Sequence, residues 1–164
     1  MKRIAAAAGV AEGSLYLYFE SRQNLMDELL PFVGKKMQEY IKRKIVSSSD
    51  IYEMEDKGIR AFFDFVDENE GFFRILNEAE TASPVAHEEH YKMLGESYKK
   101  SLKRGILDGS IKNFEEDELE AIAYILMAAR SYLHLRYFRN KSADEYSLDK
   151  VISIYNKMLR HGLT

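Results

Sequence analysis

Residues 4–25 read IAAAAGVAEGSLYLYFESRQNL, and this stretch decides the fold. Its alanine-rich beginning predicts a short helix from Lys2 to Ala8, and Gly9 can adopt the positive φ that ends a helix. A second short helix is predicted from about Glu12 to Phe19. Two short helices joined at a glycine are typical of a helix-turn-helix, which places its second helix in the major groove of DNA.

Helical spacing divides this motif into a buried and an outward side. Leu15 and Phe19 are four residues apart and share the predicted buried face of the second helix. The side chains predicted to pack behind them are Ile4, Ala5 and Ala8 on the first helix and Val10 at the corner. On spacing alone, a plain helical hairpin with Tyr16 and Tyr18 at the edge of its core explains the pattern equally well.

Taken together, these residues resemble the DNA-binding motif of the TetR (tetracycline-repressor-like) family. The resemblance covers about the first thirty residues, and it implies a repressor that dimerises through its C-terminal helices and loses operator affinity when a small molecule binds its core. By position it implies that Lys2 lies near the DNA backbone. The residues implied to face DNA are Gly13, Ser14, Tyr16, Leu17, Tyr18 and Arg22. The motif that carries the resemblance is Ile4-Ala5, Ala8-Gly9-Val10, Gly13-Ser14-Leu15-Tyr16-Leu17-Tyr18-Phe19, Ser21-Arg22 and Leu25.

Three departures from the family pattern affect this expectation. Ala11 stands where the family usually has Ser or Thr, so the second helix lacks a good N-cap, at a cost of about 1 kcal/mol. Glu12 places a carboxylate where phosphates would approach. The family also has a helix ahead of the position of Met1, which covers Ile4, Val10 and Leu15. Either the chain is truncated, or its start is misassigned, or it no longer binds DNA well, and we favour a missing N-terminal segment.

The remainder of the chain predicts an all-α fold, a helix-turn-helix DNA-binding motif followed by a helical ligand-binding and dimerisation domain. Strand-like alternation is nearly absent. We expect a DNA-binding domain with its connecting helix over residues 1–46 and a ligand-binding and dimerisation domain over 47–164. Pro31 is expected to kink the connecting helix, because proline lacks the backbone N–H. The helices expected after the motif are one capped by Ser21 that runs to about Val46, one from about Ile51 to Glu68, one that follows the turn Asn69-Glu70-Gly71 and runs to about Thr81, one from Pro84 to about Leu107, one from Glu116 to about Phe138, and one capped by Ser147 that ends at Gly162.

Composition narrows the class of protein. The chain has 164 residues with no cysteine, which excludes disulfide scaffolds, cysteine-ligated metals and thiol catalysis. Its longest uncharged apolar run, Ala121 to Ala129, is too short to span a membrane, so we expect a cytoplasmic protein. The net charge is −3, but residues 1–46 carry eight basic and five acidic side chains, which leaves −6 on the remainder. We therefore expect any contact with double-stranded DNA to be at the N-terminal end.

The C-terminal helices offer candidate ligand and dimer contacts. Aromatic residues with a few polar groups are used by both small-molecule pockets and ordinary cores, and for each single aromatic the core interpretation is favoured. The polar candidates for the binding of an unknown small-molecule effector are Glu78, His87, Tyr91, Arg130 and His134. Two helices that are apolar on more than one side indicate a homodimer, with a fully internal helix as the alternative. The dimer candidates are Ala128, Ala129, Tyr132, Val151, Ile154, Tyr155 and Met158.

No enzyme is predicted. His87-Glu88-Glu89-His90 lacks the four-residue spacing of a zinc protease, and a solvated or core-edge role for the two histidines is favoured over a metal site. No phosphate-binding loop or nucleophile motif occurs, and no cofactor is indicated. The favoured function is a ligand-responsive DNA-binding regulator acting as a homodimer on a palindromic operator. The alternatives are a helical dimer that does not bind DNA but takes a small molecule or a partner protein, and a helical metal enzyme that uses His87 and His90.

Overall fold

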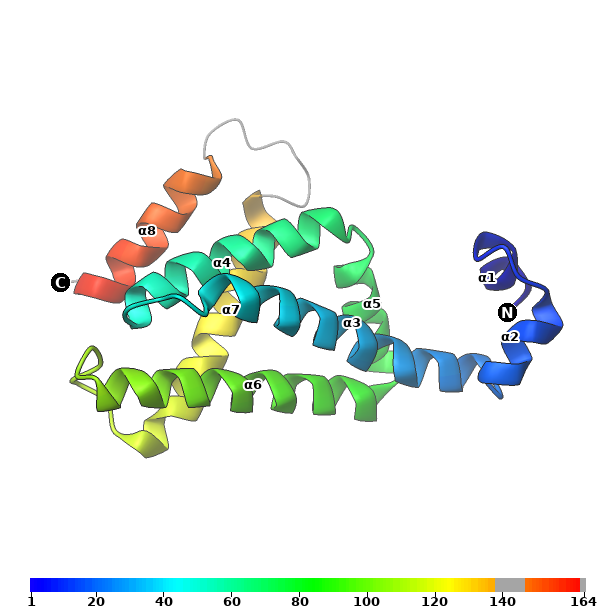
Figure 1. Ribbon diagram of the computed structural model, residues 1–164, viewed down its shortest axis with the longest axis horizontal. Coiled ribbons are helices and arrows are strands. Elements are labelled where there is room, and N and C mark those ends of the chain that lie inside the picture. The colour runs from blue at the N-terminus through cyan, green and yellow to red at the C-terminus, as the bar shows by residue number, and fades with distance from the viewer. Residues whose placement is uncertain (138–146, 163–164) are drawn as a thin grey trace. The chain divides into compact units, whose positions relative to one another are not determined.

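The computed structural model describes residues 1–137 and 147–162, and every regular element within these ranges is helical (Figure 1). The predicted all-α fold is therefore confirmed. Most predicted boundaries agree within one residue, and the prediction that a helix reaches Phe138 lies outside the described residues. The elements are α1 (Lys2–Ala7), α2 (Glu12–Tyr18), α3 (Arg22–Ile45), α4 (Ile51–Glu68), α5 (Phe72–Ala82), α6 (Pro84–Leu107), the 3₁₀ turn η1 (Glu116–Glu118), α7 (Leu119–Tyr137) and α8 (Leu148–His161).

Side-chain caps fix where several helices begin. The Asp50 carboxylate accepts the N–H of Glu53 at 2.8 Å, and the Ser21 hydroxyl accepts the N–H of Asn24 at 3.0 Å. Ser147 caps α8 in the same way, as predicted. Such caps satisfy N–H groups that have no partner within the helix, so these polar residues start the helices that follow them. The acidic residues predicted to begin the long C-terminal helix form the separate turn η1, and α7 begins after it. In η1 the side chains of Glu115 and Glu118 each accept the backbone N–H of the other residue.

Packing divides the chain into two compact units. Unit 1 comprises Met1–Lys36 and Glu70–Tyr91, and unit 2 comprises Met37–Asn69 and Lys92–Thr164. α3 is a continuous helix through Pro31, and the predicted kink there stays a prediction. The division of function at residue 46 likewise stays a prediction.

In unit 1 the beginning of α3 is hydrogen-bonded to the helical corner between α5 and α6. The Gln23 amide donates to the carbonyl of Ala82 at 2.5 Å, and the Ser83 hydroxyl donates to the Asp27 carboxylate. These hydrogen bonds, first from Ser83 and then from Gln23, lower the pKa of Asp27 below its ordinary value. Ser83 is fully buried, whereas Gln23 and Asp27 are exposed, so the corner is tied to the first two turns of α3 by hydrogen bonds at the surface of the unit.

His90 packs α6 closely against α3 within unit 1. The side chain is 2% exposed, and a Cβ added to Gly34 would lie 2.4 Å from its Nδ1 atom. Only glycine therefore fits at position 34 while the imidazole keeps this place. Burial, and then the neighbouring His87, lower the pKa of His90 from 6.5 to about 4.

We expect His90 to make the folded protein less stable in mild acid. The folded state keeps the imidazole neutral, while the unfolded chain takes up a proton near pH 6.5, so the free energy of unfolding falls as the pH falls from the unfolded towards the folded pKa. Between these two pKa values the free energy of unfolding should fall by about 3 kcal/mol. Urea unfolding between about pH 7 and pH 4.5 should show this slope for the wild type and not for His90→Gln, which carries no titrating group. Equal slopes for the two proteins would contradict the assignment.

Unit 2 is built around α4, which contacts both α7 and α8 (Figure 1). Residues of α4 at helical spacing, Ile51, Glu55, Ile59 and Phe62, are all buried. The fully buried Leu102, Leu119 and Ile152 come from the other helices of this unit. A carboxylate thus occupies a position in an otherwise apolar stripe, and buried charges persist only when they are paired. None of the helices within the described ranges is both long and apolar enough to cross a membrane.

Candidate nucleic-acid interface

α1 and α2 meet at a sharp corner that depends on Gly9. This residue has a φ of +69°, a conformation that favours glycine, and the next residue, Val10, donates its N–H to the carbonyl of Ala5 at 3.0 Å. Ala5 and Leu15 are the buried residues of the two helices, as predicted. Two short helices that contact each other across this corner form a helix-turn-helix.

Four residues differ from the predicted packing of the motif. Ala8, expected to pack behind α2, is exposed. Ile4 and Val10, expected to be covered, are 41% and 45% exposed, because no described residue packs over their outer side. Phe19, expected within the second helix, is the extended residue that ends α2, and it is half-buried. Ala11 makes no side-chain cap, as the sequence predicted.

The outward side of α2 presents three large side chains to solvent. Leu17 is 83% exposed, Tyr18 78% and Tyr16 49%. A Cβ at Gly13 would meet no atom within 4 Å, so the backbone is open to close approach there, and Ser14 is half-buried beside it. Exposed aromatic and aliphatic groups with hydroxyls on one helix face suit contacts with phosphates and with thymine methyl groups.

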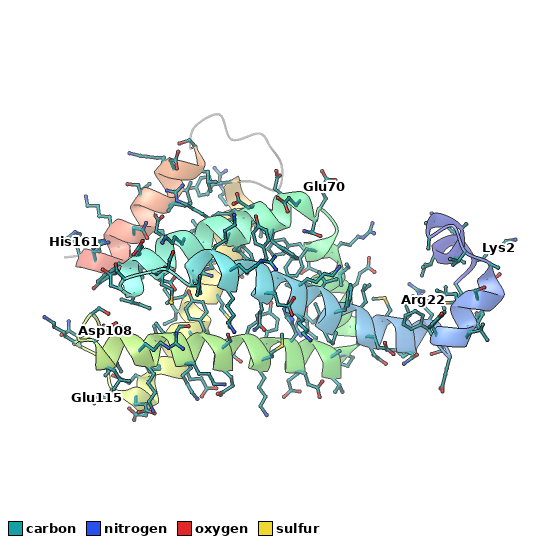
Figure 2. All side chains as sticks on the ribbon, viewed as in Figure 1. Lys2, Arg22, Glu70, Asp108, Glu115 and His161 are labelled. Carbon is teal, nitrogen blue, oxygen red and sulfur yellow. The ribbon has the colours of Figure 1, made fainter. Side chains whose placement is uncertain are left out.

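Basic residues flank this face on the neighbouring helices. Lys2 lies on α1 and Arg22 is the first residue of α3, and both are exposed (Figure 2). Arg22 lies at the positive end of a 24-residue helix, where the helix dipole adds to its charge. The exposed carboxylate of Glu12, at the start of α2, opposes this attraction.

The candidate effector residues fall in different units. Within unit 1, the rings of His87 and Tyr91 lie 4.9 Å apart, while Glu78 is exposed and pairs with Arg74. Burial raises the pKa of Tyr91, and the charge of Glu80 adds to this effect. Arg130 and His134 belong to unit 2, so a single pocket for all five residues stays a prediction. His134 lies against the ring of Phe63, at 6.2 Å between centroids.

The candidate dimer residues divide into exposed and buried groups. Tyr132 is 71% exposed, Ile154 50% and Met158 39%; Ala128 is also exposed and Ala129 is half-buried. Val151 and Tyr155 are each 3% exposed, and the chain's own core takes them up. They share their buried side of α8 with Ile152, whereas Ile154 and Met158 lie on the adjoining flank of the same helix, where the apolar stripe reaches solvent.

Sequence reasoning missed a buried polar cluster in unit 2. Glu55 was not among the candidates, yet its carboxylate binds the guanidinium of Arg130 and the hydroxyl groups of Tyr98 and Tyr155. The helical spacing of Glu55 from Ile51 and Ile59 is a signal that could have found it. Among the described residues, no group of three or more His, Cys, Asp or Glu side chains could hold a metal ion, and His87 and His90 form no such site.

Comparison with known proteins agrees with this geometry. Residues 1–29 match the family model of bacterial regulatory proteins, tetR family, which confirms the resemblance of the N-terminal motif. No curated protein matches the sequence.

Solved structures share the fold over nearly the whole chain. A candidate fatty acid metabolism regulator of Clostridium perfringens is 19% identical, with a TM-score of 0.77 over 99% of this chain and 88% of its own. A candidate TetR-family transcriptional regulator of Syntrophomonas wolfei is 22% identical, with a TM-score of 0.72 over 100% and 85%. The TetR-family regulator PfmR of Thermus thermophilus is 18% identical, with a TM-score of 0.71 over 98% and 86%. The chain therefore has the fold of TetR-family regulators, a helix-turn-helix followed by a helical domain.

Proposed function

We propose that this chain, a TetR-family regulator by its N-terminal motif and its fold, acts as a ligand-responsive repressor that binds a palindromic operator as a homodimer in the cytoplasm. The exposed outward face of α2 is the single observation that carries the proposal. Large apolar side chains are usually buried, so the exposure of Leu17 and Tyr18 on one short helix favours a binding surface. The basic side chains of Lys2 and Arg22 supply the sequence-independent attraction to phosphates.

Band-shift titration of the gene's own upstream DNA tests this function. The wild-type protein should retard this DNA at moderate salt, and Tyr16→Ala should weaken binding about tenfold, because one contact of the outward face is lost. The Tyr16 side chain is half exposed, so its removal takes little contact area from the core of the motif. Absence of any shift by the full-length gene product would favour the alternative, a helical dimer that does not bind DNA. The exposed carboxylate of Glu12 is the feature that favours this alternative.

The proposed dimer surface lies on α7. Five of its apolar side chains are exposed or half-exposed at the spacing of one helix face, and such a face packs against a symmetry-related copy in a four-helix interface. Ile154 and Met158 on α8 extend the apolar surface. Buried Val151 and Tyr155 are not part of the surface that we now propose. The α7 residues are Ala121, Ile125, Ala128, Tyr132 and Leu135.

We expect Ala128→Lys to weaken dimerisation at least a hundredfold. Each copy would then place an unpaired ammonium in the centre of the apolar surface, and two-fold symmetry repeats the penalty. Sedimentation velocity across micromolar concentrations measures the monomer fraction. Ala82→Lys, at an exposed alanine of α5, is the matched control and should remain dimeric. Two variants with the same sedimentation behaviour would place the interface elsewhere.

The proposed response to an effector uses the hydrogen bonds of unit 1. Gln23 and Asp27 on the first turns of α3 hold the corner at Ala82 and Ser83. A change in the position of α6 would therefore act directly on the helix that follows the DNA-binding motif. Such a displacement changes the fit of α2 to DNA, which is how binding at a distance lowers operator affinity.

A further inference from the structure

The cluster around Glu55 joins α4, α6, α7 and α8 within unit 2. One carboxylate oxygen of Glu55, Oε2, accepts from Arg130 Nη2 at 3.0 Å and from the Tyr155 hydroxyl at 2.8 Å, and the other, Oε1, accepts from the Tyr98 hydroxyl. Burial raises the pKa of both tyrosines above the ordinary value, so both hydroxyls keep their protons and act as donors. Glu55 thus receives three donors, which is what an ionised buried carboxylate needs.

One strong donor in this cluster has no partner among the residues that the structure describes. Arg130 is only 7% exposed, its Nε atom is buried, and no described residue accepts a hydrogen bond from that atom. The guanidinium is held in place from several sides. The ring of Tyr98 lies 5.0 Å from its Cζ atom, and a Cβ added to Gly58 would lie 3.0 Å from Nη2. A buried N–H that is left unpaired costs free energy, so a position of this kind calls for an acceptor.

The charges of the cluster select the kind of acceptor. Glu55 and Arg130 compensate each other, so the cluster has no net charge. A carboxylate brought to Nε would leave one buried negative charge without a partner, which the interior strongly disfavours. A carbonyl or ether oxygen satisfies the same N–H and leaves the charges balanced.

Buried apolar residues neighbour Glu55 and Arg130 along their own helices. On α4, Ile59 and Phe62 follow Glu55 on the same buried side of the helix, and on α7 Leu126 precedes Arg130 by one turn. A molecule that reaches Nε must therefore place its remaining surface against hydrocarbon and aromatic groups. This combination of one orienting donor and apolar walls is typical of small-molecule sites.

We propose that Arg130 Nε is the recognition point for an uncharged, largely apolar effector, which binds through a carbonyl oxygen of an ester, ketone or amide. The inference rests on the proposed function, since it names the chemical class of the effector of that regulator. Glu55 acts as a positioning residue that neutralises and orients Arg130 and excludes acids from the site.

Matched ester and acid pairs test the inference on the full chain. The probes are methyl hexanoate, methyl decanoate and methyl phenylacetate, each compared with its free acid by thermal unfolding and calorimetry. At least one ester should raise the Tm of the wild type by about 5 °C at saturating concentration, and its acid should have little effect. Acids that stabilise as well as the esters, or no stabilisation by any ester, would overturn the proposal. In the second case a water molecule on Nε is the expected partner in a high-resolution crystal structure.

Two variants assign the binding to the cluster. Arg130→Lys keeps the positive charge beside Glu55 but removes Nε, and it should weaken ester binding at least about tenfold. Glu55→Gln leaves the cluster with a positive charge, so the free acid should become the preferred ligand. If Glu55→Gln does not fold, Arg130→Lys still decides the question. Arg104→Lys, at an exposed arginine of α6, is the control and should bind esters as the wild type does. If Arg130→Lys also binds esters as tightly as the wild type, the proposal is overturned.

These measurements are independent of DNA. A protein that shifts its upstream DNA but binds no ester leaves the proposed regulator intact and removes this inference. A protein that binds the ester but does not shift DNA supports ester recognition at Arg130 and contradicts the proposed regulator. The two outcomes can be told apart because calorimetry detects ester binding without an operator.

Discussion

Glu55→Ala is expected to lower the free energy of unfolding by about 3 to 5 kcal/mol. The substitution removes the acceptor of three buried donors and leaves the guanidinium of Arg130 inside the protein without a counter-charge. A loss of this size is a large share of the stability of an ordinary domain, so a marked fall in Tm should accompany it. Urea unfolding followed by circular dichroism measures the effect.

The controls separate the buried ion pair from the loss of any carboxylate. Asp64→Ala removes an exposed carboxylate from the same helix and should change the free energy of unfolding by no more than about 0.5 kcal/mol. Adding Arg130→Met to Glu55→Ala removes the uncompensated charge and should recover at least about half of the loss. If Glu55→Ala costs no more than Asp64→Ala, the cluster does not hold unit 2 together.

Leu17→Glu is expected to weaken binding to the upstream DNA at least a hundredfold. The side chain is 83% exposed, so its replacement leaves the core untouched, but the new carboxylate faces the phosphates and base edges that the proposal places against α2. Fluorescence anisotropy with labelled DNA, repeated at two salt concentrations, measures both the affinity and its salt dependence.

The matched control is Leu107→Glu. This leucine is 79% exposed at the end of α6, so the substitution makes the same chemical change at a similarly exposed site in the other unit. Its affinity for DNA should remain within about twofold of the wild type. Equal losses in the two variants would show that net charge, and not the outward face of α2, determines the binding.

The parts of the fold that the sequence predicts well are those fixed by local chemistry. Gly9, Ser21, Asp50 and Ser147 each act on backbone groups within a few residues, so their effects can be worked out from the chain itself. The outward face of α2 is also local, because helical spacing alone determines which side chains oppose Leu15.

Contacts between distant residues could not be predicted in this way. Glu55 and Arg130 are 75 residues apart, and Glu55 lies among charged residues that look like a solvated surface in the sequence. For α8 the spacing predicted one apolar stripe containing Val151, Ile154 and Met158. It did not determine which side the chain's own core takes and which side remains exposed. That choice depends on the neighbouring helices, which the local pattern does not contain.

The hydrogen bonds at the α5–α6 corner, in which Gln23 donates to Ala82 and Asp27 accepts from Ser83, have a genetic consequence. Ser83 lies more than sixty positions from α2 in the sequence, yet it is joined to the start of the helix that carries Arg22. For the repressor that we propose, heritable loss of repression would have two physical origins. One is substitutions that alter the surface of α2, and the other is substitutions near residue 83 that leave this surface intact but release its support. Alleles of the second kind would look, in a screen, like defects of DNA contact at positions that never touch an operator.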